Sequence, residues 1–306
     1  MRGDVREIPH LRPPVDLLEQ PPCPFHANWS AATSSAPDGW SADMEVVILP
    51  GPDDCGRVVA DILARAVGNG GAGTRPTLGL ATGSSPLTAY RELIRRHREE
   101  GLSFAGVRTV NLDEYVGLPA DHPESYRSVI RRELTAHLDI SDDDVHGPDG
   151  SASDPLVAAR EYEQQLRDGG PVAVQLLGIG ANGHIGFNEP GSSLTSLTRV
   201  KTLTEQTRRD NARFFDSPDD VPRHVITQGL GTISRAQHLV LTASGAGKAA
   251  AVAAAVEGPL TASCPASVLQ LHPHATVVVD DAAAAALERA DYYRYTLEHK
   301  LPHQPF

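Results

Sequence analysis

The sequence predicts an α/β fold in a single domain: a doubly wound, mostly parallel sheet with helices on both faces. Short apolar runs, which are typical of strands buried on both sides, alternate along the chain with segments of helical periodicity. Glycines and polar side chains directly follow several of these runs, at the strand ends where such folds bind ligands. A length of 306 residues with 40% hydrophobic content is sufficient for one large core.

The predicted elements begin near residue 44, where a proline-rich segment without periodicity gives way to an apolar, strand-like run. The expected strands are 45–49, 77–81, 107–112, 172–177, 239–242 and 276–279. The expected helices are 53–67, 87–98, 204–215 and two alanine-rich helices that contain 249–255 and 282–286. Alanine is the strongest helix former, which favours a helix in both of the alanine-rich runs. This alternation indicates one Rossmann-like domain over residues 44–306.

Residues 1–43 differ from the rest of the chain. They hold seven prolines among several serines and alanines and show neither helical nor strand periodicity. Such a composition buries too little apolar surface to offset the entropy lost on ordering. We therefore expect a disordered N-terminal extension.

Net charge and cysteine content narrow the partners and the compartment. A formal charge of -12, with acidic residues spread along the chain, argues against nucleic acid and anionic membranes as partners. A small anion held by a local basic pocket is still compatible with it. Three widely spaced cysteines do not form the pattern of a disulfide framework, so we expect a cytoplasmic location. The chain has no run of about 18 apolar residues for a membrane span, and its N-terminus lacks the core of a secretory signal.

The most informative stretch is GIGANGHIGFNEPG, residues 178–191. Gly178, Gly180 and Gly183 match the G-x-G-x-x-G pattern after an apolar run, which favours a dinucleotide-binding turn. That turn must open a helix whose N-terminus faces the pyrophosphate. The residues that follow here, with two more glycines and a proline, are hostile to a helix. The stretch is therefore predicted to be a glycine-shaped loop.

Three polar side chains in this loop carry its chemistry: Asn182, His184 and Glu189. Histidine exchanges protons near neutral pH, and a neighbouring carboxylate can orient and polarise its imidazole. A lone histidine is more often structural, but one in a glycine loop beside Asn and Glu favours a catalytic role. Metal binding is disfavoured because the chain has no H-E-x-x-H motif and no paired cysteines.

Asp113 and Glu114 directly follow the strand over 107–112. A partly desolvated carboxylate at that strand end has a raised pKa and can abstract a carbon-bound proton. The alternative for an isolated Asp-Glu pair is an acid that stabilises a turn or caps a helix. The two residues alone do not separate these interpretations.

Three segments are candidates for binding an anion. The turn TGSSP over 82–86 can offer backbone N–H groups and hydroxyls at the start of a helix, although Ser85 could serve only as the N-cap. Lys248 could reach an anion or be an ordinary solvated lysine. Arg209 and Arg213 share a face of the helix over 204–215, where a solvated face is the alternative. None of these segments matches the nucleotide P-loop.

Taken together, the motifs closely resemble those of glucosamine-6-phosphate deaminases. The resemblance covers about residues 44–290 and keeps the order of the motifs. They are ATGSSP at 81–86, NLDEYVGL at 111–118, HPESY at 122–126, the loop at 178–191, TRVKTL at 198–203, NARFF at 211–215 and LQLHP at 269–273.

The resemblance implies a cofactor-independent enzyme of amino-sugar metabolism that converts glucosamine 6-phosphate and water into fructose 6-phosphate and ammonia. It implies that His184, supported by Asn182 and Glu189, opens the pyranose ring and that Asp113 then takes the C2 proton. It also implies a phosphate site. The phosphate ligands would be Thr82, Gly83, Ser84, Ser85, Arg213 and Lys248.

Two positions depart from the family pattern. Asn182 stands where many members carry Asp, which removes one negative charge; other members also carry Asn, so we expect activity. Leu197 stands where an Arg is frequent, next to residues that bind an activating phosphosugar at a subunit interface in regulated members. The residues that match that regulatory pattern are Ser192, Arg199, Lys201 and Thr202. The resemblance leaves open activation by N-acetylglucosamine 6-phosphate and a homo-oligomer.

Three other functions compete. A 6-phosphogluconolactonase shares the fold but resembles D-E-R and G-H-T-A-S-L-F-P where this chain has Asp113-Glu-Tyr and a different loop. A non-catalytic sugar-phosphate sensor would be fused to a DNA-binding module, for which residues 1–43 are too short and too rich in proline. A dinucleotide-dependent dehydrogenase would require the helix that the loop excludes.

Overall fold

The computed structural model describes residues 44–68, 75–119 and 121–301. The predicted extension over 1–43 lies outside the described residues and stays a prediction. Within the described part of the chain, no helix is long and apolar enough to cross a membrane.

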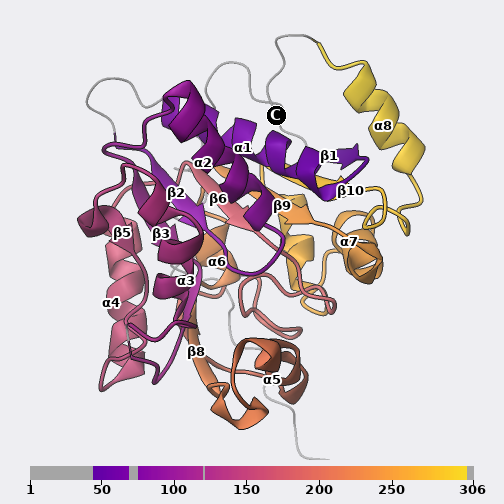
Figure 1. Ribbon diagram of the computed structural model, residues 1–306. Coiled ribbons are helices and arrows are strands. Elements are labelled where there is room, and N and C mark those ends of the chain that lie inside the picture. The colour runs from indigo at the N-terminus through magenta and orange to yellow at the C-terminus, as the bar shows by residue number, and fades with distance from the viewer. Residues whose placement is uncertain (1–43, 69–74, 120, 302–306) are drawn as a thin grey trace, which may run out of the picture. The chain divides into compact units, whose positions relative to one another are not determined.

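A sheet of seven parallel strands forms the centre of the fold (Figure 1). Its order is β1-β10-β9-β6-β2-β3-β5, and every neighbouring pair is parallel. The strands are β1 (Met44–Leu49), β2 (Thr77–Leu80), β3 (Arg108–Asn111), β5 (Val145–His146), β6 (Val174–Leu177), β9 (His238–Ala243) and β10 (Ala275–Asp280). From β2 the chain winds outward through β3 to β5, and from β6 it winds the other way through β9 to β10. The winding therefore reverses between β2 and β6, where doubly wound sheets bind their ligands.

Helices cover both faces of this sheet. They are α1 (Pro52–Gly68), α2 (Leu87–Glu100), α3 (Tyr126–Glu133), α4 (Pro155–Asp168), α6 (Leu230–Ile233), α7 (Ala249–Val256) and α8 (Ala290–Glu298). A further helix, α5 (Glu205–Asn211), lies away from the large sheet and contacts the 3-10 turns that follow it. Side chains of β10 alternate between two apolar cores, so that Val277 and Val279 pack with α6 and α7, whereas Val278 packs with α1 and α2. The predicted fold class is confirmed.

A second sheet of three antiparallel strands was not predicted. Its strands are β4 (Asp113–Tyr115), β8 (His224–Thr227) and β7 (Arg199–Thr202), in the order β4-β8-β7. Only Leu112 separates β3 from β4, so the chain passes directly from the large sheet into the small one. Figure 1 shows β8 running away from the large sheet toward α5. This sheet carries Asp113, which lies opposite Thr227 of β8.

The prediction of a helix over 282–286 is wrong. These alanines form consecutive turns, and the next helix, α8, begins only at Ala290. The Asp280 carboxylate accepts the N–H of Ala283 at 2.7 Å and the N–H of Gly245 at 3.0 Å. These bonds and the burial of Ala283 and Ala284 fix the turns. Tertiary packing here overrides helix propensity, which is worth only a few tenths of a kcal/mol per residue. The other alanine-rich run forms α7, as predicted.

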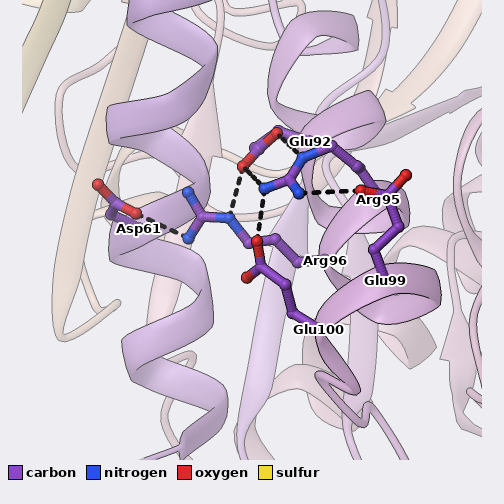
Figure 2. Close-up of polar contacts among 6 residues, drawn as sticks. All are labelled: Asp61, Glu92, Arg95, Arg96, Glu99 and Glu100. Atoms are coloured by element: carbon purple, nitrogen blue, oxygen red, sulfur yellow. Dashed lines mark hydrogen bonds and ion pairs between the residues drawn. The ribbon is translucent and has the colours of Figure 1, made fainter.

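An ion-pair network joins α1 to α2 (Figure 2). Arg96 contacts Asp61 of α1 and Glu92 of its own helix, both at 2.7 Å. Arg95 contacts Glu92 at 2.8 Å and also pairs with Glu99 and Glu100. Most of these groups are partly or fully exposed, so each pair adds at most about 1 kcal/mol to stability. The network orients two helices on the surface, and it lies outside the cavity described below.

Candidate active site

A cavity of about 470 Å³ lies where the winding of the sheet reverses. Its walls come from the turn after β2, the start of β4, the loop after β6, helix α3 and the segment 207–215. Eight of the residues predicted from the sequence line this one cavity. They are Thr82, Gly83, Ser84, Ser85, Asp113, His184, Arg213 and Lys248.

The turn after β2 leads into α2 without using its hydroxyls as caps. The N-cap residue of α2 is Pro86, with no side-chain cap hydrogen bond, and the Leu87 N–H bonds to the Ser84 carbonyl. The alternative in which Ser85 serves only as the N-cap is therefore wrong. Gly83 has a φ of +96°, a conformation that L side chains rarely adopt. The hydroxyls of the turn and the N-terminus of a 14-residue helix face the same cavity.

Two cations face this turn across the cavity. Lys248 is half-buried, and its Nζ donates to the Ile179 carbonyl at 2.6 Å, so it is not an ordinary solvated lysine. Burial and the charge of Arg213 lower the pKa of Lys248, and the carboxylate of Asp210 offsets part of that effect. Within the described residues, neither cation forms an ion pair. Two close positive charges without a paired carboxylate favour an anion between them.

Arg209, the other arginine predicted to share this face, lies outside the cavity. It is exposed, and its guanidinium lies 3.5 Å from the Glu205 carboxylate one helical turn away. The solvated alternative is thus correct for Arg209, whereas Arg213 is also exposed but lines the cavity, so its role as an anion ligand stays a prediction. Helix α5 ends at Asn211, and a short 3-10 turn carries Arg213 in a different direction from the helical face.

Asp113 and Glu114 have different roles: one carboxylate lines the cavity, and the other stabilises the start of a helix. Asp113 lines the cavity and is only 5% exposed. Burial, with a smaller contribution from the charge of Glu114, raises the pKa of Asp113 well above its usual value. A Cβ on Gly186 would come within 3.4 Å of the Asp113 carboxylate, so a glycine lets the loop after β6 approach it. The structure thus holds a buried carboxylate with raised proton affinity at the cavity wall.

Glu114 points away from the cavity and holds the start of α3 in place. Its carboxylate accepts the backbone N–H groups of Tyr115 and Tyr126 at 2.8 Å and of Arg127 at 2.9 Å. Burial raises the pKa of Glu114, and these three bonds offset only part of the effect. Glu114 is therefore the helix-terminus acid of the pair.

Replacing Glu114 with glutamine is expected to lower the unfolding free energy by about 1–3 kcal/mol. An amide cannot accept three N–H bonds, so at least one buried N–H loses its partner. Urea unfolding, followed by far-ultraviolet circular dichroism, measures the change in unfolding free energy. A loss below about 0.5 kcal/mol, the usual range for an uninvolved surface position, would contradict this role.

The loop after β6 is shaped around the imidazole of His184. No helix follows β6, as predicted. The Gly180 N–H bonds to the His184 carbonyl at 2.9 Å, and a Cβ on Gly180 would lie 2.2 Å from the imidazole ring. A Cβ on Gly183, which has a φ of +83°, would meet the Cys264 Sγ at 2.7 Å. The glycines therefore make room for a histidine ring and a neighbouring segment, a role unlike that in a dinucleotide turn.

Asn182 connects His184 to Glu189. The Asn182 Oδ1 lies 2.7 Å from the His184 Nδ1, and the Asn182 Nδ2 donates to the Glu189 Oε2 at 2.6 Å. The direct distance from Glu189 to the His184 Nδ1 is 3.6 Å. Burial by itself would raise the pKa of Glu189, but its contacts with His184, Thr207 and Asn182 outweigh burial and lower the pKa to about 2. Since Asn182 accepts at Nδ1, the Nε2 atom is left to exchange a proton with a ligand.

The residues that match the regulatory pattern do not line the cavity. Ser192 is buried, and its hydroxyl has no hydrogen-bond partner within the described residues. Arg199 donates to the Asn188 Oδ1 at 2.9 Å, and burial lowers the pKa of its guanidinium. Lys201 and Thr202 follow it along β7.

Several cavity residues were assigned no role from the sequence, although most of them lie in the motifs that carry the resemblance. Tyr115, Tyr126 and Phe187 form an aromatic wall, with Tyr126 and Phe187 stacked at 6.1 Å. Asn211 donates to the Tyr115 hydroxyl at 3.0 Å. Thr207 lines the cavity and donates to the Glu189 Oε1. The spacing of Thr204 and Thr207 indicates a helix cap, which is present, but not the contact with Glu189.

Fold and site together define an α/β enzyme whose cavity is equipped for proton transfer on a small anionic molecule. Residues 53–279 match the family model described as glucosamine-6-phosphate isomerases/6-phosphogluconolactonase, and the chain belongs to that family. The resemblance inferred from the motifs is confirmed.

Two relatives illustrate the similarity in sequence. The glucosamine-6-phosphate deaminase of Rhodococcus opacus (strain B4) is 61% identical over 263 residues, which cover 86% of this chain and 100% of the relative. The glucosamine-6-phosphate deaminase of Streptomyces coelicolor (strain ATCC BAA-471 / A3(2) / M145) is 57% identical over 260 residues, which cover 84% of this chain and 98% of the relative.

Solved structures agree on the fold. A monomeric glucosamine-6-phosphate deaminase matches with a TM-score of 0.77 and 43% identity, covering 79% of this chain and 100% of its own. The 6-phosphogluconolactonase from Trypanosoma brucei matches with a TM-score of 0.64 and 22% identity, covering 80% of this chain and 99% of its own, a likeness in fold alone.

Proposed function

We propose that this chain is a glucosamine-6-phosphate deaminase, which converts glucosamine 6-phosphate and water into fructose 6-phosphate and ammonia. The observation that carries the proposal is one cavity that is lined by a buried carboxylate, a histidine hydrogen-bonded to Asn182, and two cations that form no ion pair within the described residues. Relatives that carry this name and are 57–61% identical support it.

The first proposed step is opening of the pyranose ring by His184. Its Nε2 takes the proton of the C1 hydroxyl and returns a proton to the ring oxygen, so that the C1–O5 bond breaks and C1 becomes an aldehyde. Asn182 orients the imidazole ring of His184 through its Nδ1 atom. Glu189 stabilises the positive charge that this imidazole carries between the two proton transfers.

The second proposed step is transfer of the C2 proton to Asp113. The C1 aldehyde acidifies the C2 hydrogen, so a carboxylate with raised pKa is a sufficient base. Loss of the proton gives an enolate, which becomes an enolamine when O1 takes a proton from solvent. Asp113 then returns its proton to C1, which gives a protonated imine at C2. Water adds across the C2=N double bond, ammonia leaves, and the ketone of fructose 6-phosphate remains. The protonation changes balance without any added oxidant or reductant.

The proposed phosphate ligands are the turn Thr82 to Ser85, Arg213 and Lys248. A helix N-terminus and two cations offer both N–H donors and opposite charge to a dianion. The phosphate lies at the far end of the substrate from C1 and C2, so its binding energy positions the reacting carbons.

Replacing Arg213 with methionine is expected to raise KM about 10- to 100-fold, since a charged hydrogen bond contributes about 1.5–3 kcal/mol. Steady-state ammonia release measures the change. Arg209→Met is the matched control, because it removes an arginine from the same segment but outside the cavity. Equal KM values for the two variants would contradict the proposed phosphate site.

The function itself is tested by offering two substrates to the purified chain without added cofactors. Glucosamine 6-phosphate should yield ammonia and fructose 6-phosphate, and 6-phosphogluconolactone should be hydrolysed no faster than in buffer. Hydrolysis of the lactone with no release of ammonia would identify a lactonase and overturn the proposal.

The proposal extends to a cytoplasmic enzyme that forms a homo-oligomer. The free, buried thiols of Cys55 and Cys264 are compatible with a reducing compartment. Ser192, Arg199, Lys201 and Thr202 are the proposed site for an activating N-acetylglucosamine 6-phosphate. Sedimentation and ammonia release with and without this sugar test both points: a monomer whose rate does not change would overturn them.

A further inference from the structure

We infer that Thr207 is a positioning residue, whose hydroxyl fixes the orientation of Glu189 and couples the Asn182–His184 relay to the helix that leads to Arg213. This inference rests on the proposed roles of His184 and Arg213. It concerns a residue that touches neither relay partner directly, and acts through Glu189.

The hydrogen bonds around Thr207 have one consistent direction. Its side chain is buried, and the Thr204 Oγ1 donates to the Thr207 Oγ1 at 2.9 Å. A hydroxyl has a single proton, so Thr207, which accepts from Thr204, gives its own proton to the Glu189 Oε1. The chain of donors therefore runs from Thr204 through Thr207 to Glu189.

Glu189 depends on this donor. Among the described residues, Thr207 is the donor to Oε1, whereas Oε2 accepts from Asn182 and faces His184. Glu189 is only 5% exposed, so water cannot readily replace a lost partner. Without the hydroxyl, the carboxylate is free to rotate away from the plane in which Asn182 meets it. The Asn182 amide would then lose the contact that directs its Oδ1 toward His184.

The hydroxyl is not needed to form the helix. The cap of α5 is made by the Thr204 Oγ1, which accepts the backbone N–H of Thr207 at 3.1 Å. That bond uses the backbone N–H of Thr207 and not its side chain, so it is retained in the valine and serine variants tested below. The contact with Glu189 is therefore separable from helix formation, which distinguishes positioning from capping.

The same helix leads to the proposed phosphate ligand. Thr207 lies in α5, and the 3-10 turn Ala212–Phe214 that carries Arg213 begins where α5 ends. Both Thr207 and Arg213 line the cavity. Binding of a phosphate by Arg213 thus holds the helix that orients Glu189, and the histidine is aligned when the substrate is in place.

Three variants test the inference. Thr207→Val keeps the branched shape and the backbone cap but removes the hydroxyl, and Thr207→Ser keeps the hydroxyl. Thr232→Val is the matched control: Thr232 is also buried and donates to a carboxylate, Glu163 at 2.8 Å, but it lies outside the cavity. All three are assayed for ammonia release from glucosamine 6-phosphate, and their unfolding is measured alongside.

We expect Thr207→Val to lower kcat about 10- to 100-fold, the usual effect of removing a supporting partner. KM should change less than about threefold, because the phosphate ligands remain. Thr207→Ser should keep kcat within about threefold of the wild type, and Thr232→Val should lose stability without losing kcat.

Wild-type kcat in Thr207→Val, failure of serine to rescue it, or an equal loss of kcat in Thr232→Val would overturn the inference. A crystal structure of Thr207→Val gives a result that does not depend on turnover. There the contact between Asn182 Oδ1 and His184 Nδ1 should be lost, and its retention at 2.7 Å would also overturn the inference. If the wild type releases no ammonia, the proposed function fails, and this structural comparison still decides the role of Thr207.

Discussion

Replacing Asp113 with asparagine is expected to lower kcat for ammonia release about 10³-fold, within the range that a positioned general base contributes. The amide keeps the size and the place of the side chain at the cavity wall but cannot accept the C2 proton. Stopped assays with high enzyme concentration measure the residual rate. Glu114→Gln is the control, because it changes the neighbouring carboxylate that faces away from the cavity. An Asp113→Asn rate within tenfold of the wild type would contradict the assignment.

The same substitution is expected to make the protein more stable at neutral pH. Burial raises the pKa of Asp113, so its ionised form is disfavoured in the folded chain relative to the unfolded chain. A carboxyl group shifted in this direction contributes its full stability below its unfolded pKa and loses it as the pH rises through the folded pKa. An asparagine removes that cost, so Tm should rise at pH 7 and much less at pH 3. For the wild type, kcat should fall on the acid side at a pH above the usual pKa of aspartate.

A higher Tm together with a lower kcat would show that Asp113 serves catalysis, because replacing a residue that only supports the fold does not raise Tm. Glu114→Gln should show the reverse, a lower Tm with a smaller loss of kcat. If Asp113→Asn instead lowers Tm at neutral pH, the carboxylate is a structural partner and the proposed role as base is wrong.

Replacing His184 with glutamine is expected to lower kcat about 10²-fold or more. Glutamine can still contact Asn182, but it cannot carry a proton from the C1 hydroxyl to the ring oxygen near neutral pH. KM should change little, because the proposed phosphate ligands remain. The residual rate should be limited by ring opening.

Substrate deuterated at C2 locates the step that has been slowed. In His184→Gln, ring opening should limit the rate and cleavage of the C2–H bond should not. The deuterated and ordinary substrates should therefore react equally fast. In Asp113→Glu, which retains a displaced carboxylate, the deuterated substrate should react more slowly. An isotope effect in His184→Gln and none in Asp113→Glu would mean that His184 takes the C2 proton and Asp113 opens the ring, which is the reverse of the proposal.

The sequence was sufficient to predict those parts of the fold in which local pattern and packing agree. Six of the seven parallel strands coincide with runs predicted as strands, whereas β5, with only two residues, was not predicted. Residues 178–191 contain too many helix breakers to continue as a helix. The small sheet could not be predicted in the same way. Its strands β4 and β7 hold three and four residues, too few to establish a period, and they pair only because β8 comes between them.

The site shows the same limit. Order along the chain places Asp113 and Glu114 at one strand end, but the alternation of side chains and the position of α3 decide which carboxylate faces the cavity. Spacing puts Arg209 and Arg213 on one helical face, but the helix ends at Asn211 between them. Thr207 meets Glu189 from 18 residues away in sequence. Such contacts depend on the tertiary structure and leave no periodic signal.

The assignment of Asp113 as the base of a glucosamine-6-phosphate deaminase is tested by following glucosamine 6-phosphate with the purified chain and no added cofactor, beside an equal amount of folded Asp113→Asn. Ammonia and fructose 6-phosphate are quantified together in the same reaction. We expect equal amounts of the two products from the wild type and almost none from the variant. No turnover by the wild type, or equal turnover by Asp113→Asn, would contradict it.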